Sequence, residues 1–151
     1  MTWRDRMAEL GVELPSVAAP AGSYVPAVRT GSLVFTSGQV PIVDGAVAAT
    51  GKVGGEVSPE EAQRLARVCA LNALAAVDAL VGLDAVVRVV KVVGFVASAE
   101  GFTGQPAVLN GASDLLAEVF GEAGKHARSA VGVAELPLGV PVEVEIVVEV
   151  R

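Results

Sequence analysis

Residues 58–81 carry the strongest secondary-structure signal in the chain, a long helix with a defined start and end. Ser58 can cap this helix, Pro59 suits its first position and Glu61 can complete a capping box, while Gly82 supplies the stop. Apolar residues recur at helical spacing along one face, which we expect to be buried: Ala62, Leu65, Ala66, Cys69, Ala73, Val77 and Leu80.

Valine-rich runs mark the strands. The segment Val86–Ala97 is too β-branched for a good helix and predicts a strand that is buried on both faces. The segment Pro141–Val150 alternates, with apolar residues on one face and Glu143, Glu145 and Glu149 on the other. Further strands are expected at 24–28, 33–40 and 128–134, with a hairpin that turns at Asp44-Gly45.

Two more helices are expected. A short one spans 2–10, with Thr2 as N-cap and Gly11 as stop, and a longer one spans Pro106–Phe120 and stops at Gly121. No repeat or linker divides the chain, so we expect one domain over 1–151, in which residues 1–21 form an N-terminal helix and an extended arm. The order of elements predicts an α+β domain with two long helices on one face of a mostly antiparallel sheet.

The amino-acid composition indicates how the other face of that sheet could be covered. AVILMFWYC residues make up 52% of the chain, and 17 glycines come in addition, which exceeds the roughly 45–50% usual for apolar residues with glycine included. Such a surplus is typical of a chain that hides apolar surface in an oligomer. The net charge of −6 argues against a large phosphate-binding surface, so no nucleic acid partner is expected.

The sequence lacks the features that define several classes of protein. The longest uncharged stretches, Leu14–Val28 and Thr30–Val43, fall short of the ~20 apolar residues of a membrane-spanning helix. The N-terminus does not resemble a signal peptide, so we expect a cytoplasmic protein. One cysteine and one histidine leave no set of ligands for a metal, and no phosphate-binding glycine loop or nucleophile elbow is present, so no metal or cofactor is expected.

Two charged residues near the C-terminus are candidates for a site. Arg128 shares a strand face with Ala130, Gly132 and Ala134, which are all small and leave room for a ligand beside the arginine. A guanidinium binds a carboxylate with a planar fork of donors, so a small carboxylate-bearing ligand is expected. The alternative is a surface arginine paired with a nearby glutamate. Glu143 begins the last strand, and its alternative is a solvated residue on an outer face.

Three further residues have simple structural interpretations. Tyr24 is the only tyrosine in the chain and could pack at the edge of the sheet. Cys69 lies on the apolar stripe of the long helix and is expected to be a small core residue. His126 follows Gly124-Lys125 in a loop, either solvated or close to Arg128.

Five short motifs together resemble one family. They are Tyr24-Val-Pro-Ala-Val28, Gly31-Ser-Leu-Val-Phe-Thr-Ser-Gly-Gln39, His126-Ala-Arg-Ser-Ala-Val131, Leu136-Pro137 and Val142-Glu-Val-Glu145. From about Ala21 to the C-terminus the chain resembles the Rid family, the reactive intermediate deaminases, which are also called YjgF-like and were formerly labelled endoribonuclease L-PSP. The Ser-Gly-Gln and Ala-Arg-Ser motifs, with the expected strands and helices between them, carry most of the specificity.

The resemblance implies a chorismate-mutase-like α+β fold and a homotrimer with clefts between subunits. It implies hydrolysis of enamines and imines, such as 2-aminoacrylate, to a 2-keto acid and ammonia, without a metal or organic cofactor. Arg128 would hold the substrate carboxylate and Glu143 would position the attacking water. Tyr24, Ser37 and Gly38 would line the same cleft.

The chain also departs from the family pattern. The tyrosine motif, often Pro-Tyr-Ser-Gln, is here Ser23-Tyr24-Val25-Pro26, and Ala130 stands where cysteine is common. The arm before Ala21 is longer than usual. The loop within 97–110, which would border the cleft, is also unusual, and its Phe102 is included among the expected substrate-binding residues. These differences predict a distinct subgroup with its own substrate.

Three functions remain open at this point. The first is an imine deaminase, and the second is a module that binds a 2-keto or amino acid in the same cleft without turnover. Both need Arg128, so only an assay with an aminoacrylate substrate separates them. The third is a ribonuclease, which the net charge of −6 and the single histidine disfavour.

Overall fold

Five strands form one mixed sheet in the order β1-β2-β7-β5-β6 in the computed structural model, which describes all 151 residues. The strands β5 and β6 run parallel and every other pair is antiparallel. The bounds are β1 Ala27–Thr30, β2 Leu33–Thr36, β5 Val86–Ala97, β6 Ala127–Val133 and β7 Val142–Val150.

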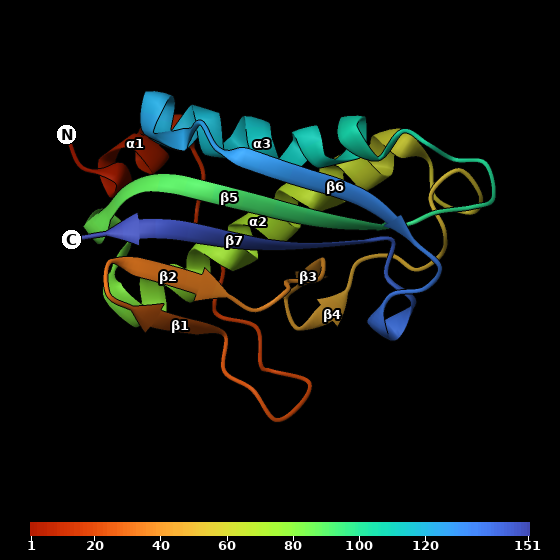
Figure 1. Cartoon of the computed structure of the whole chain (residues 1–151), viewed down its shortest axis with the longest axis horizontal. Helices are drawn as coiled ribbons and strands as arrows, with labels where there is room; N and C mark the ends of the chain where they lie inside the picture. The colour runs from red at the N-terminus through yellow and green to blue at the C-terminus, as the bar shows by residue number, and fades with distance from the viewer.

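Two long helices pack on one face of this sheet. In Figure 1 the sheet faces the viewer, α2 (Pro59–Val81) runs behind β5 and β7, and α3 (Gln105–Phe120) lies along the β6 side. The helices also pack against each other. This arrangement confirms the predicted α+β fold with two long helices on one face. No helix in the chain combines the length and the hydrophobicity that a membrane crossing requires.

The helix ends follow the predicted caps with one exception. The Ser58 Oγ atom accepts a hydrogen bond from the Glu61 N–H at 3.1 Å, and α2 ends before Gly82. The Glu61 carboxylate does not complete a capping box, because it binds the Arg64 guanidinium one turn further along. The predicted stripe is buried except at Leu80, which is 45% exposed in the last turn, while Leu83 just beyond the helix is fully buried.

The N-terminal helix is anchored to the rest of the fold. In α1 (Trp3–Leu10) Thr2 and Asp5 form a reciprocal capping box, and Gly11 ends the helix in the left-handed region with φ 68°. The Trp3 indole N–H donates to the Val86 carbonyl at 2.7 Å, and its ring packs edge-on against Phe120. The arm after α1 crosses behind the sheet and forms the loop that projects beyond β1 in Figure 1.

The first strands are shorter than the sequence predicts. The strand β1 begins only at Ala27, after Pro26, and β2 ends at Thr36, although Gln39 still pairs with Val144 through an isolated bridge. Proline has no N–H to contribute to a strand pair, which limits β1 at this end. The predicted hairpin is confirmed as β3 (Ile42–Val43) and β4 (Ala46–Val47), where Asp44 and Gly45 both adopt the positive φ of a type I′ turn.

One face of the sheet has no cover within the chain. On β5 the side chains of Val89, Val92 and Val96 are buried against the helices, but Val87 and Val90 are exposed. The prediction that this strand is buried on both faces is therefore wrong for the single chain, because no element packs on the second face. We call this second face the outer face. It also carries Phe35 and Val131, each 44% exposed.

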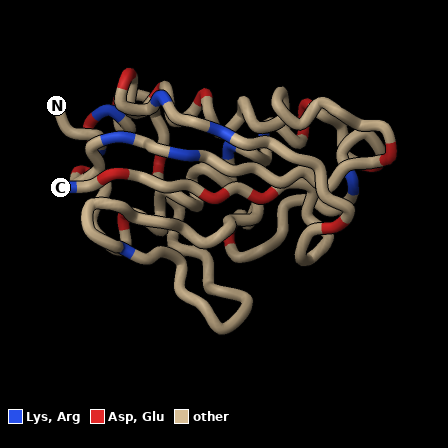
Figure 2. Tube along the Cα trace, in the orientation of Figure 1, with Lys and Arg blue, Asp and Glu red and all other residues tan.

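Charged residues share the outer face with these apolar side chains. Figure 2 shows acidic positions along β7 beside basic positions on β5. Arg88 is the register partner of Glu149, while Glu143 and Glu145 lie opposite the uncharged residues Phe95 and Val93. The acidic residues at the start of β7 therefore have no basic partner across the strand.

Candidate functional site

A cavity of about 240 Å³ brings three of the predicted site residues together: Tyr24, Gly38 and Glu143. It lies where β7 begins, between the segment after β2, the arm and the 3-10 turn at Pro137–Gly139. The rest of its lining is mostly apolar: Ala18, Ala19, Pro20, Ala21, Pro26, Gln39, Val40, Ile42, Pro137 and Leu138.

Glu143 is the only acidic residue in the lining of this cavity. Its side chain lies against Gly38, where a Cβ atom would come within 2.8 Å of the Glu143 Cδ atom. Burial raises the pKa of Glu143 above its ordinary value, and the neighbouring Glu145 carboxylate raises this pKa further. Since Glu143 forms no salt bridge, no basic partner opposes this rise. Such a carboxyl group is suited to hold and release a proton.

Tyr24 and Ser37 each form a hydrogen bond with the backbone near the cavity. The Tyr24 hydroxyl accepts a hydrogen bond from the Ala21 N–H at 3.1 Å, and the tyrosine is 49% exposed. The Ser37 hydroxyl donates to the Val25 carbonyl at 2.6 Å, so it holds the segment that carries Tyr24. Ser37 itself is not part of the lining.

Two parts of the lining of this cavity were not predicted from the sequence. The first is the arm: Ala18–Ala21 form a wall of the cavity although their apolar composition carries no chemical signal. The second is Gln39, which is 7% exposed and donates from Nε2 to the Ser37 carbonyl at 3.3 Å. Its place beside Ser37-Gly38 in the motif was the available signal.

Arg128 lies on the other face of the sheet, next to α3. Its register partner on β5 is Val92, which points toward the helices. The guanidinium Nη1 donates to Asn110 Oδ1 at 2.8 Å and to Ser113 Oγ at 3.2 Å, and Nη2 donates to the Pro106 carbonyl at 3.3 Å. Arg128 forms no salt bridge, so the alternative of a surface ion pair with a glutamate is wrong.

The small residues beside Arg128 do not leave the open space that was predicted. Ala130 packs against the hydrophobic core. At Gly132 a Cβ atom would lie 2.8 Å from the Gln105 Nε2 atom and 3.0 Å from the Ser98 Oγ atom. Ala134 falls beyond the end of β6. These residues are small because α3 and its N-terminal segment already lie against the strand.

The hydrogen bonds of Arg128 leave part of its guanidinium free. A guanidinium has five N–H donors, and the contacts to α3 use both donors of Nη1 and one donor of Nη2. The Nε–H and the second Nη2–H have no partner within the chain. Two donors on adjacent nitrogens form the fork that binds the two oxygens of a carboxylate.

Phe102 does not join either group. Its ring packs over the backbone of Gly54 and Gly104, where added Cβ atoms would lie 3.1 Å and 2.9 Å from the ring or its Cβ, and it borders the hydrophobic core. It is absent from the lining of the Glu143 cavity. Within one chain, therefore, Tyr24, Gly38 and Glu143 lie together, whereas Arg128 and Phe102 lie elsewhere.

For Cys69 the structure confirms the predicted core position, and for His126 it rules out the solvated alternative. Cys69 is fully buried, and burial raises the pKa of its thiol well above the ordinary value, which confirms a core residue. His126 is half-buried rather than solvated, and it contacts Ser113, which also contacts Arg128.

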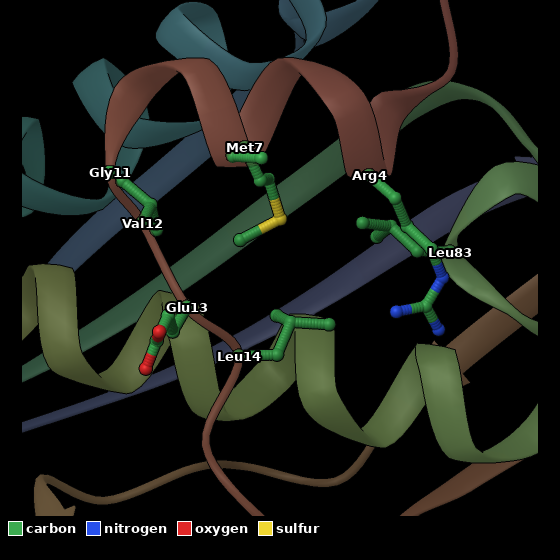
Figure 3. A pocket seen from close by; sticks show the side chains of 8 residues that line it. Arg4, Met7, Gly11, Val12, Glu13, Leu14 and Leu83 are labelled. Atoms are coloured by element: carbon green, nitrogen blue, oxygen red, sulfur yellow. The ribbon is translucent and has the colours of Figure 1, made fainter.

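A larger cavity than the one at Glu143 lies away from these residues. It has a volume of about 440 Å³ between α1, the arm and the segment after α2. Figure 3 shows Met7, Leu14 and Leu83 around this space, with Arg4 at its side. Arg4 is engaged in a salt bridge with Asp78, so the charge at this cavity without an ionic partner is the carboxylate of Glu13.

The fold and the site define a class of protein. A mixed sheet backed by two long helices, with an arginine fork next to α3 and a protonatable carboxyl group on the outer face, is a chorismate-mutase-like domain with a candidate site for a small anion. The chain belongs to the family described as "YjgF/chorismate mutase-like, putative endoribonuclease", which matches residues 4–150. The family resemblance and the fold predicted from it are thereby confirmed.

Relatives match most of the chain. Protein TCP17 of Trypanosoma cruzi is 48% identical over 144 residues, which cover 94% of this chain and 90% of that protein. The crystal structure of Atu1372 from Agrobacterium tumefaciens, a protein of unknown function, is 46% identical with a TM-score of 0.90 and covers 99% of this chain and 92% of its own. The structure of TdcF from E. coli with bound serine is 28% identical with a TM-score of 0.64, covering 90% and 93%.

Proposed function

We propose that the protein hydrolyses small imines and enamines that carry a carboxylate, such as 2-aminoacrylate, to a 2-keto acid and ammonia. The observation that carries this proposal is that Arg128 keeps a donor on Nε and one on Nη2 without a partner in the chain, and two donors on these nitrogens can bind the two oxygens of a carboxylate. The serine bound to TdcF has a carboxylate and a nitrogen on the same carbon, as the proposed substrate does. This ligand therefore supports the same substrate class.

A complete site requires more than one subunit in this proposal. Arg128 and Glu143 lie on opposite faces of the sheet, and β5 separates their strands. Neighbouring strands are about 4.8 Å apart, so one small substrate does not contact both residues within one chain. In a homotrimer, the edge strand β6 that carries Arg128 of one subunit would meet the outer face of the next subunit beside Glu143, and this contact would cover the exposed apolar side chains Phe35 and Val131.

The proposed reaction needs a positioned water and a route for protons. Arg128 binds the carboxylate, and protonation of an enamine at its terminal carbon gives the protonated imine. Glu143 accepts a proton from water as the water oxygen attacks the imine carbon, and the resulting carboxyl group donates that proton to the nitrogen. The nitrogen is then a protonated amine, and it leaves as ammonia when the C–N bond breaks while the ionised Glu143 takes the hydroxyl proton. One protonated imine and one water thus yield one 2-keto acid, one ammonia and one proton, which Glu143 releases. Because the imine is already electrophilic, orientation supplies much of the catalysis.

The test is an assay of the purified full chain with 2-aminoacrylate generated in place by a serine dehydratase. We expect faster release of 2-keto acid than in the absence of the protein, and we expect Arg128→Ala to abolish the acceleration. Arg67→Ala is the matched control, because Arg67 lies on α2 and pairs with Glu118. An active wild type with an equally active Arg128→Ala variant would refute the proposed site.

The second candidate is binding of a 2-keto or amino acid without turnover. It is favoured by the apolar surroundings of Tyr24, where Val25 and Pro26 bring no polar side chain into the cavity. Calorimetry with pyruvate supports this candidate if binding depends on Arg128 while the dehydratase-coupled assay shows no acceleration. A ribonuclease is disfavoured, because Glu143 and Glu145 on the outer face and the net charge of −6 repel phosphates.

A further inference from the structure

A chain of hydrogen bonds reaches Arg128 from the loop that precedes β6. The Gly124 carbonyl contacts His126 Nδ1 at 2.6 Å, and His126 Nε2 contacts Ser113 Oγ at 2.9 Å. The same Ser113 Oγ accepts a hydrogen bond from Arg128 Nη1 at 3.2 Å. The imidazole and the serine are both partly buried, between the end of the 3-10 turn Gly121–Gly124 and α3.

The chemistry of these groups fixes the direction of the hydrogen bond to Gly124 and, for the neutral imidazole, also the direction of the one to Ser113. A backbone carbonyl only accepts, so Nδ1 of His126 carries a proton and donates to Gly124. In the neutral imidazole Nε2 then has no proton and accepts from the Ser113 hydroxyl. With its proton committed to His126, the Ser113 oxygen presents its lone pairs to the guanidinium of Arg128.

The partners of Arg128 also leave its charge intact. Its acceptors are the Asn110 amide, the Ser113 hydroxyl and the Pro106 carbonyl, none of which is ionised. A carboxylate partner in the same place would hold the guanidinium equally well but would neutralise it. The arrangement therefore orients Arg128 while its positive charge remains available to an anion.

We propose that Ser113 and His126 are positioning residues that orient the Arg128 fork toward the carboxylate of the substrate. The proposal rests on the proposed function of Arg128 and deepens it. Ser113 acts on Nη1 directly, and His126 acts through Ser113 by fixing which way its hydroxyl points. Without these hydrogen bonds the Nη1 atom of Arg128 loses one of its two acceptors. The guanidinium is then free to turn, and its Nε–H and Nη2–H lose their fixed direction.

The first test reads the tautomer of His126 by nitrogen NMR on the full-length protein at neutral pH. The chain has one histidine, so the imidazole signals need no assignment. We expect a protonated Nδ1 and a bare Nε2 whose resonance shifts in Ser113→Ala and returns toward its wild-type position in Ser113→Thr. A protonated Nε2 with a bare Nδ1, or no response to Ser113→Ala, would overturn the proposed chain.

The second test separates positioning from a general structural role. A hydrogen bond to a charged group contributes enough binding energy that Ser113→Ala and His126→Ala should each raise the KM for an imino acid about tenfold. We expect kcat to change less than threefold, because Glu143 and its water are untouched. Ser113→Thr and His126→Gln, which restore a hydroxyl and an acceptor, should recover most of the lost affinity.

The control is Ser32→Ala, whose hydroxyl lies in the turn between β1 and β2 and forms no hydrogen bond. Thermal melts of all variants show whether a change reflects misfolding, and the two conservative variants keep the test decisive if an alanine variant does not fold. Wild-type KM values in folded Ser113→Ala and His126→Ala would overturn the positioning role alone. A wild type that neither hydrolyses imines nor binds pyruvate would overturn the proposed function, and the positioning role with it.

Discussion

Gly38 and Glu143 are in direct contact across the start of β7: a Cβ atom on Gly38 would lie 2.8 Å from the Glu143 Cδ atom and 3.0 Å from its Oε1 atom. The backbone of Gly38 is not in the left-handed region, so its conformation is open to other residues. The glycine at this position is thus required by the neighbouring carboxyl group rather than by the turn.

Gly38→Ala should displace the Glu143 side chain without unfolding the protein. The atoms in the way are at the far end of a flexible side chain, so we expect the free energy of unfolding to change by less than about 1 kcal/mol. The value of kcat for imine hydrolysis should fall at least about tenfold because the carboxyl group leaves its position, a loss of ~1.4 kcal/mol of transition-state stabilisation. The control is Gly55→Ala, where the nearest atom would lie at an ordinary 3.4 Å. Equal kcat values for the two variants would show that the displacement does not matter.

The pH dependence of the reaction should respond to Glu145. Burial is the larger cause of the raised pKa of Glu143, and the Glu145 carboxylate is the second cause. Glu145→Gln removes this repulsion, so the pKa of Glu143 falls and the acid limb of the kcat/KM profile moves to lower pH. Glu149→Gln, further along β7 and opposite Arg88, should leave the profile in place. A shift of the acid limb to higher pH would contradict the assigned cause.

The stability of the folded protein should also depend on the ionisation of Glu143. Because the pKa of Glu143 is higher in the folded state than the ordinary 4.5, ionisation costs stability as pH rises through the folded pKa, and below the ordinary pKa no such cost exists. Glu143→Gln should therefore unfold at higher denaturant concentration than wild type at neutral pH, while the two midpoints converge near pH 4. A gain that is equal at both pH values would assign the effect to packing.

Replacement of Arg128 should separate the charge from the fork. Lysine keeps the positive charge but cannot reach Asn110, Ser113 and a carboxylate with a planar set of donors. We expect Arg128→Lys and Arg128→Ala to lose at least about a hundredfold in kcat/KM, ~2.7 kcal/mol of transition-state stabilisation. Circular dichroism checks the fold. A substantially active Arg128→Lys variant would mean that charge alone is sufficient.

Cys69 should contribute to stability and not to catalysis. Its side chain is fully buried on α2, with Sγ facing the Val142 carbonyl. We expect Cys69→Ala to lower the free energy of unfolding by roughly 1 kcal/mol, the cost of a small cavity, and to leave kcat unchanged. A thiol reagent should label native protein far more slowly than unfolded protein; rapid labelling of the native form would contradict the burial.

The uncovered outer face predicts that the protein assembles into an oligomer. Light scattering at micromolar concentration should give the mass of three chains, as expected for a trimer that covers Phe35 and Val131. Val131→Glu places a charge among these apolar side chains and should lower the mass to that of one chain, with imine hydrolysis lost together with the assembly. Ser32→Glu, in the turn at the end of the sheet, serves as the charge control. A monomeric wild type would remove the basis for a shared site.

Local signals were sufficient for most of the secondary structure. The bounds of α2 follow from Ser58, Pro59 and Gly82, and the alternation of β7 follows from its valines, since caps and spacing depend only on nearby residues. Pairing across the sheet was harder to predict. Val86–Ala97 was predicted to be buried on both faces, because its composition does not reveal which face a helix packs against.

Candidate residues for the site could be selected from the sequence, but their arrangement could not be predicted. Arg128 and Glu143 could be selected by their charge and their place among small or alternating residues. That they lie on opposite faces depends on the register of β5 with β6 and β7, which no local pattern encodes. The contacts of Arg128 with Asn110 and Ser113 likewise depend on how α3 lies over β6.

The arm residues Ala18–Ala21 close the Glu143 cavity without belonging to any helix or strand. Their backbone takes no part in the pairing of the sheet, so substitutions, insertions or deletions there alter the width of the cavity while the sheet and helices keep their geometry. Variation in this short segment can therefore change which ligand the cavity admits. The positions of Glu143 and Arg128 would be unaffected, because strands hold both residues.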